Sequence, residues 1–157
     1  MTITSSAHQR LDDLGHQLPA PAVAAAYEGA IRWGDTLITS GQLPLRDGAL
    51  VATGSVGGDV GLEAAQEAAR HCALNVLAQA HQATGDLDAI ARLQKITVFV
   101  ASAPGFTDQH LVANAASELL VQVLGQAGRH ARSAIGVASL PMNAAVEVEA
   151  TFQLVAR

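Results

Sequence analysis

The sequence predicts an α+β fold in which two helices cover one face of a single β-sheet, and two patterns support this. Segments in which polar and apolar residues alternate, as in half-buried strands, occur in the early, middle and late parts of the chain. Two longer segments repeat apolar residues every three or four positions, as amphipathic helices do. After a short N-terminal helix, the predicted order β-β-α-β-α-β-β suits one sheet with helices on one side.

The composition indicates one globular domain without disulfides. Of the 157 residues, 50% are hydrophobic and 3% aromatic, so the chain can bury a core built from Ala, Val, Leu and Ile. The formal charge is −5 and there is no run of Lys and Arg, which argues against a nucleic-acid partner. A single cysteine, Cys72, suits a reducing compartment.

The N-terminal part of the chain is predicted to be an extension over residues 1–21, followed by the domain over 22–157. A short helix is expected over Ser6–Leu14, and two nearby prolines prevent it from continuing. The N-terminus lacks the charged and then apolar layout of a signal peptide, and no apolar stretch approaches the ~20 residues that span a bilayer. We therefore expect a cytoplasmic protein without a membrane partner.

The domain is predicted to begin with a β-hairpin. β-prone residues over Tyr27–Trp33 and Thr36–Gln42 flank the dipeptide Gly34-Asp35, a pattern typical of two strands joined by a tight turn. A second turn at residues 46–48 and a flexible Gly-rich loop at 54–58 follow.

Two helices and a strand are predicted for the middle of the chain. Apolar residues at helical spacing predict a helix over Leu62–Gln82, with Gly85 as its stop. Leu93–Ala101 is a strong strand candidate, and a second amphipathic helix is expected over roughly Thr107–Leu124. Because Cys72 lies on the apolar stripe of the first helix, we interpret it as a buried structural residue.

The last two strands are predicted over Ser133–Leu140 and Ala145–Leu154. Neither face of the first carries a charge, which is typical of a strand buried on both faces. With helices on one side only, we expect other copies of the chain to cover the second side. If the two strands form a hairpin about Met142, Glu147 lies opposite Val137, and about 16 Å of strand separates that residue from Arg132. Arg132 and Glu147 could then contact one small ligand only if the chain bends sharply or if the site is shared between subunits.

Arg132 and Glu147 are the candidates for chemistry. An arginine at a strand end is commonly just exposed, but its planar guanidinium also matches a carboxylate in a bidentate pair. Glu147 could equally be one of two carboxylates on a solvated strand face, or a group that positions or deprotonates water. None of the six histidines forms a short-spaced metal-ligand pattern with another His, Cys or carboxylate, so no metal site is expected.

The late segment ARSAIGVASLPMNAAVEVEA resembles the C-terminal signature of the Rid family, also called YjgF or endoribonuclease L-PSP. The resemblance extends upstream over about residues 22–155. It includes the S-G-Q core within Ile38–Pro44, Tyr27 before it, the central strand Lys95–Val100 and Asn114 in the second helix. Each motif alone is weak, but the combination is specific.

The resemblance implies a chorismate-mutase-like α+β fold and a homotrimer with ligand clefts between subunits. It also implies hydrolysis of reactive enamines and imines, such as 2-aminoacrylate, to 2-keto acids and ammonia without a cofactor. Carried over to this sequence, Arg132 would hold the substrate carboxylate and Glu147 would orient the attacking water. Tyr27 and Asn114 would line the cleft, and the backbone at Gly41 would contact the ligand.

The chain also departs from the usual family pattern. Ala134 stands at a substrate-binding position where many members have a cysteine, and His130-Ala131 replaces the usual proline before the arginine. The N-terminal extension and the Gly-rich loop are longer than in the short members. These differences indicate a divergent subgroup and leave two alternatives open. The first is a trimeric, non-catalytic binder or sensor of small carboxylates, and the less favoured second is a ribonuclease, which an acidic chain does not suit.

Overall fold

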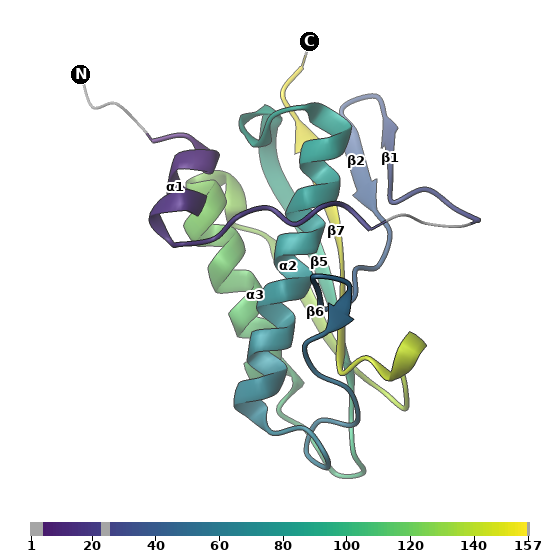
Figure 1. Ribbon diagram of the computed structural model, residues 1–157. Coiled ribbons are helices and arrows are strands. Elements are labelled where there is room, and N and C mark those ends of the chain that lie inside the picture. The colour runs from purple at the N-terminus through teal and green to yellow at the C-terminus, as the bar shows by residue number, and fades with distance from the viewer. Residues whose placement is uncertain (1–4, 23–25, 157) are drawn as a thin grey trace.

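The structure, a computed structural model that describes residues 5–22 and 26–156, contains a mixed five-stranded β-sheet (Figure 1). The strand order is β1-β2-β7-β5-β6, in which β5 and β6 are parallel and the other neighbours are antiparallel. The bounds are β1 Ala30–Trp33, β2 Thr36–Thr39, β5 Ile90–Ala101, β6 Ala131–Val137 and β7 Val146–Leu154. The predicted α+β class and the single main sheet are confirmed.

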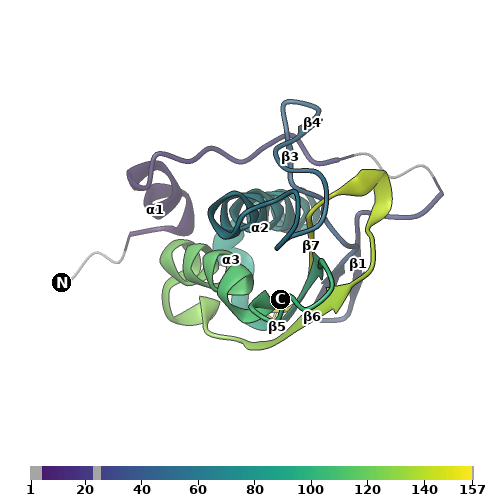
Figure 2. The same ribbon diagram turned by 90° about the horizontal axis from the view of Figure 1, so that it is seen from below.

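Two long helices, α2 (Leu62–Thr84) and α3 (Gln109–Leu124), cover one face of this sheet (Figures 1 and 2). Their small apolar residues pack on the buried side of β5 and β7, where Phe152, Val148 and Ile96 are fully buried. The helix α1 (Ala7–Asp13) is capped by Ser6 and lies beside α3, with its Leu11 in the core. The helices therefore leave the other face of the sheet open.

Two element boundaries lie where local features of the sequence predicted them. The hairpin turn between β1 and β2 falls at Gly34-Asp35, and Gly34 has φ +58°, a conformation that glycine adopts without steric penalty. Helix α2 ends as predicted at Gly85, whose φ of +79° is the left-handed helix cap. The β-prone segment before the first hairpin becomes strand only from Ala30.

The predicted hairpin between the last two strands is wrong, because β5 lies between β6 and β7. In place of a tight turn, the connection crosses the end of β5 through the short 3₁₀ turn Pro141–Asn143. Backbone hydrogen bonds from Gly54 N–H to Asn143 O (2.9 Å) and from Ala145 N–H to Ala52 O (3.3 Å) hold it on the loop before α2. The alternation in sequence predicted which residues of each strand are buried but could not identify the neighbouring strand.

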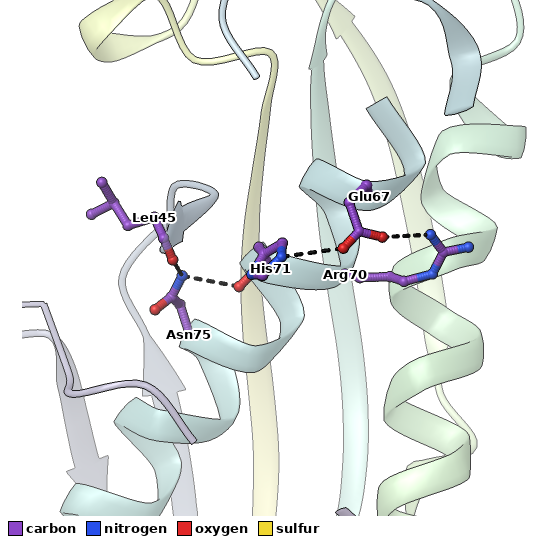
Figure 3. A network of polar contacts seen from close by, with 5 residues as sticks. All are labelled: Leu45, Glu67, Arg70, His71 and Asn75. Atoms are coloured by element: carbon purple, nitrogen blue, oxygen red, sulfur yellow. Dashed lines mark hydrogen bonds and ion pairs between the residues drawn. The ribbon is translucent and has the colours of Figure 1, made fainter. Parts of the chain in front are cut away.

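A small second hairpin, β3 (Leu45–Arg46) with β4 (Ala49–Leu50), is hydrogen-bonded to α2. The Asn75 side chain amide donates to the carbonyl oxygens of Leu43 (3.1 Å) and Leu45 (2.9 Å), and to that of His71 in the preceding helical turn (2.9 Å). Figure 3 shows this amide beside the ion pairs of Glu67 with His71 and Arg70. The buried amide replaces the hydrogen bonds that these loop carbonyls would otherwise make to water.

The open face of the sheet carries several large apolar side chains. Ile31, Trp33, Ile38 and Ile135 are exposed by 58%, 84%, 50% and 41%. The strand β6, which we predicted to be buried on both faces, is therefore exposed on one face in a single chain. The first three lie together on β1 and β2, whereas Ile135 lies on the opposite edge strand. A group of exposed apolar side chains such as that on β1 and β2 marks an interaction surface. Among the described residues, no helix combines the length and apolar content that crossing a membrane requires.

Candidate functional site

Arg132 lies near the start of the edge strand β6 and points toward helix α3. Its Nη1 donates to Asn114 Oδ1 (2.9 Å) and to Ser117 Oγ (3.2 Å), so α3 fixes the orientation of the guanidinium. The side chain is half-buried, and its Nε and Nη2 have no hydrogen-bond partner among residues 5–22 and 26–156. One edge of a fixed planar donor group is thus available to a ligand.

His130 joins this cluster, although the sequence analysis discounted all six histidines. Its Nδ1 lies 2.5 Å from the carbonyl oxygen of Gly128, and its Nε2 lies 2.9 Å from Ser117 Oγ. Because a carbonyl only accepts, Nδ1 carries the hydrogen, and in the neutral ring Nε2 accepts from the serine hydroxyl. Ser117 therefore accepts from Arg132 and donates to His130. The sequence did hold a clue, since residues two apart in an extended segment share a side.

These residues line a hollow of about 320 Å³ at the edge of the sheet, which we call the inner hollow. Its lining residues are Ser117, Val121, Arg129, His130 and Arg132. The charged groups among them are cationic, and Val121 supplies an apolar wall. The inner hollow is therefore suited to an anion with a short apolar body.

Glu147 lies on the open side of β7, against the backbone at Gly41. The paired hydrogen bonds Gln42 N–H to Val148 O (2.8 Å) and Val148 N–H to Gln42 O (3.0 Å) bring this loop alongside the strand. A Cβ on Gly41 would overlap the Glu147 carboxylate, so only glycine allows this approach. Burial raises the pKa of Glu147, and the neighbouring Glu149 charge adds to the effect.

Tyr27, Ala134 and Cys72 have simpler surroundings. Tyr27 is 65% exposed and precedes the segment in which Gly29 O accepts a hydrogen bond from Ser40 N–H (2.9 Å), so it lies at the same end of the first hairpin as Gly41. Ala134 is half-buried on β6 and packs against the core. Cys72 is fully buried, as predicted, and burial raises the pKa of its thiol, which makes it unreactive.

The predicted site residues thus form two separate groups on one chain. Arg132 and Asn114 lie at the β6 edge, whereas Glu147, Gly41 and Tyr27 lie near the β2–β7 side. Glu147 pairs with Phe99, which lies opposite Ile135, so the predicted pairing with Val137 is wrong. From these registers, Arg132 and Glu147 are about 10 Å apart along the strands and about 10 Å across them. Their side chains also leave opposite faces of the sheet.

The described residues contain no group of three or more His, Cys, Asp or Glu side chains that could hold a metal ion. Three of the other histidines have local partners. His71 pairs with Glu67 (3.2 Å), and His8 stacks edge-on against His81.

Comparisons with known proteins identify similar chains over almost the whole length. A family model described as "YjgF/chorismate mutase-like, putative endoribonuclease" matches residues 8–153. The protein TCP17 of Trypanosoma cruzi is 48% identical over 146 residues, which are 92% of this chain and 91% of that protein. The crystal structure of Atu1372 from Agrobacterium tumefaciens superposes with a TM-score of 0.90 at 48% identity, covering 95% of this chain and 92% of that one.

A more distant solved structure contains a small molecule. Escherichia coli TdcF with bound serine superposes with a TM-score of 0.65 at 25% identity, covering 89% of this chain and 97% of that one. The mixed sheet with helices on one face is therefore shared with these proteins.

Proposed function

Because this chain belongs to the YjgF/chorismate mutase-like family, we propose that it hydrolyses reactive 2-imino and enamine acids to 2-keto acids and ammonia. In this proposal 2-aminoacrylate is a representative substrate, and the reaction needs no cofactor. The likeness to TdcF with bound serine supports a small amino-acid-like ligand, because serine carries the carboxylate and nitrogen that such a substrate has.

The observation that carries the proposal is the environment of the Arg132 side chain. Its guanidinium is half-buried, oriented by Asn114 and Ser117, and open on one edge toward the inner hollow. Two parallel N–H···O bonds to a carboxylate would fix both the position and the direction of a small substrate. An arginine that served only as a solvated strand end would need neither partner on α3.

Glu147 is proposed to handle the water and the proton. The carboxylate accepts a proton as the water oxygen bonds to the imine carbon, and the C=N electron pair moves to nitrogen. The carboxylate returns this proton to the nitrogen, which gives the carbinolamine. Transfer of the hydroxyl proton to the amine nitrogen then lets the C–N bond break, so that ammonia leaves and the O–H electron pair forms the keto carbonyl. An enamine first becomes the imine by taking a proton on carbon and losing one from nitrogen. The raised pKa of Glu147 makes its carboxylate a stronger base than an exposed one, which suits it to take up and return a proton.

The two-group geometry supports a site shared between copies. Within one chain Arg132 and Glu147 lie on opposite faces of the sheet, so one small ligand cannot touch both. The exposed apolar side chains on the open face offer a surface for self-association. We therefore propose a homotrimer in which the Arg132 group of one copy meets the group of Glu147, Gly41 and Tyr27 of the next. Ala134 would line the cleft beside Arg132.

The proposal is tested by measuring ammonia and keto-acid release from freshly generated 2-aminoacrylate above the spontaneous rate. Removal of two charge-assisted hydrogen bonds in Arg132→Ala is expected to lower kcat/KM by roughly 100-fold. Arg46→Ala, which removes an exposed arginine of β3, is the matched control and is expected to behave as wild type. Circular dichroism and the oligomer mass must stay unchanged in both variants.

Two other outcomes separate the alternatives. Binding of small carboxylates without acceleration of any imine would exclude the enzyme and favour a carboxylate binder. Salt-sensitive RNA cleavage that survives in Arg132→Ala would favour the endoribonuclease named in the family description. That function has weaker support here, because the chain has 14 acidic residues against 9 Lys and Arg.

A further inference from the structure

The segment Gly128–Arg132 concentrates positive charge on both of its sides. On one side is the inner hollow, and on the other is a second depression of about 540 Å³, the outer hollow. The outer hollow is lined by Arg92, Leu93, Gln94, Arg129, His130 and Ala131. Arg129 and His130 therefore line both hollows. Three arginines, Arg92, Arg129 and Arg132, lie within or beside this one segment.

No acidic side chain of the described residues forms an ion pair with these arginines. The described lining of both hollows contains neither Asp nor Glu, and the ion pairs found among the described residues do not involve Arg92, Arg129 or Arg132. Since the whole chain is acidic, this concentration is a local property. Like charges repel when they are brought together, so an unbalanced cluster is expected to attract anions.

The backbone that carries these charges is held in place. Gly128 packs so closely on α3 that an added Cβ would lie 2.5 Å from Leu120 O. His130 uses both ring nitrogens to tie the segment to Ser117 and to Gly128 O, and Arg92 Nη1 donates to Arg129 O (3.3 Å). The backbone of this segment is thus fixed, so anion binding here requires little further ordering of the backbone.

A single substrate carboxylate, however, needs only Arg132. Arg129 lines the same inner hollow, and its exposed guanidinium has no other described partner there. We infer that Arg129 binds a second carboxylate, so that the preferred substrates are imino acids with a carboxylate on the side chain. This inference rests on the proposed function and specifies its substrate class. The hydrolysis step is unchanged, because the second carboxylate takes no part in bond making or breaking.

The size of the inner hollow favours a small dicarboxylate. At about 320 Å³ it is near the lower end of ligand pockets, and Val121 can pack against the methylene groups between the two carboxylates. Arg129 and Arg132 are separated by three residues of near-extended backbone, about 10 Å, and their long side chains border one hollow. Two guanidinium groups can therefore receive the two ends of a four- or five-carbon chain.

The kinetic test compares the imines of glutamate and glutamine, which an amino acid oxidase generates in the assay and which differ in charge at nearly equal size. In wild type, kcat/KM for the glutamate imine is expected to exceed that for the glutamine imine by at least about ten-fold. Arg129→Gln is expected to bring this ratio close to one, and the control Arg46→Gln should keep the wild-type ratio. A wild-type ratio near one, or a ratio unchanged by Arg129→Gln, would overturn the inference and leave the proposed function intact.

A binding test remains decisive if neither imine is accelerated and the proposed function fails. Calorimetry then compares 2-oxoglutarate with 2-oxopentanoate, which has the same carbon chain without the second carboxylate. Tighter binding of 2-oxoglutarate that is lost in Arg129→Gln supports the second carboxylate position independently of turnover. Equal affinities for the two keto acids contradict it.

Discussion

Glu147 and Glu149 point to the same open side of β7, and this pairing has a consequence for pH dependence. The charge on Glu149 contributes to the raised pKa of Glu147. If Glu147 is the base, activity falls as the pH drops through its pKa, because the protonated form cannot accept a proton from water. In Glu149→Gln this contribution is absent, so we expect the acidic limb of the pH–rate profile to move to lower pH.

The control for this shift is Glu63→Gln, which removes an exposed carboxylate in the first turn of α2 that does not contribute to the raised pKa of Glu147. It should leave the acidic limb where it is in wild type. A limb that does not move in Glu149→Gln, or that moves to higher pH, would show that another group titrates there.

For the individual residues, the sequence pointed to Arg132 and Glu147, and the resemblance pointed to Asn114 and Gly41, but other neighbours were missed. Residue type and the resemblance pointed to both, because a guanidinium before a strand and a carboxylate within one have few chemical uses together. Ser117 and His130 were missed as partners of Arg132, since contacts between a helix and a strand depend on the packing of elements far apart in the chain. Arg129 was missed because an exposed arginine has no distinguishing pattern in sequence.

Among the secondary-structure elements, helix α2 ends at Gly85 because of the backbone conformation of this glycine. Its φ of +79° lies in the left-handed region, and an added Cβ would meet no atom within 4 Å. Gly85→Ala should therefore lower the free energy of unfolding by about 1 kcal/mol through backbone strain alone. Urea unfolding at one fixed protein concentration measures this, because self-association would otherwise shift the midpoint.

Gly85→Asn is the informative companion variant, because asparagine tolerates the left-handed region better than alanine. It should recover most of the stability that alanine loses. Equal losses in the two variants would mean that something other than φ strain is responsible.

The contrast between helices and strands explains which elements could be predicted. Helix α2 was predicted to within two residues at its end, because spacing and caps are properties of neighbouring residues. The segments that form β5, β6 and β7 were also predicted as strands. Their pairing was not, because the partner of β6 is reached through α3, and the connection to β7 is a wide crossing rather than a two-residue turn.

At the scale of the whole molecule, a substitution on the open face of the sheet tests the proposed trimer. Ile38 is half-exposed on this face of a single chain, so Ile38→Asp should leave the monomer folded. A carboxylate buried between copies would be costly, and we expect the variant to lose the oligomer mass in light scattering. Loss of imine hydrolysis should accompany dissociation if the site is shared.

Ala64→Asp is the control, since it adds the same charge at an exposed position in the first turn of α2, where a carboxylate is favourable. This variant should keep the mass and activity of wild type. An Ile38→Asp protein that remains an oligomer of unchanged mass would place the interface elsewhere.

The position of β7 within the sheet bears on how the chain folds. This strand, the last in sequence order, lies between β2 and β5, so the hairpin β1–β2 has no sheet contact with the β5–β6 pair until β7 is inserted. During synthesis, the first hairpin and the central β-α-β unit would therefore be two separate pieces of sheet. The sheet becomes continuous only when the last strand has left the ribosome. This late long-range step is expected to be slower than the formation of the helices.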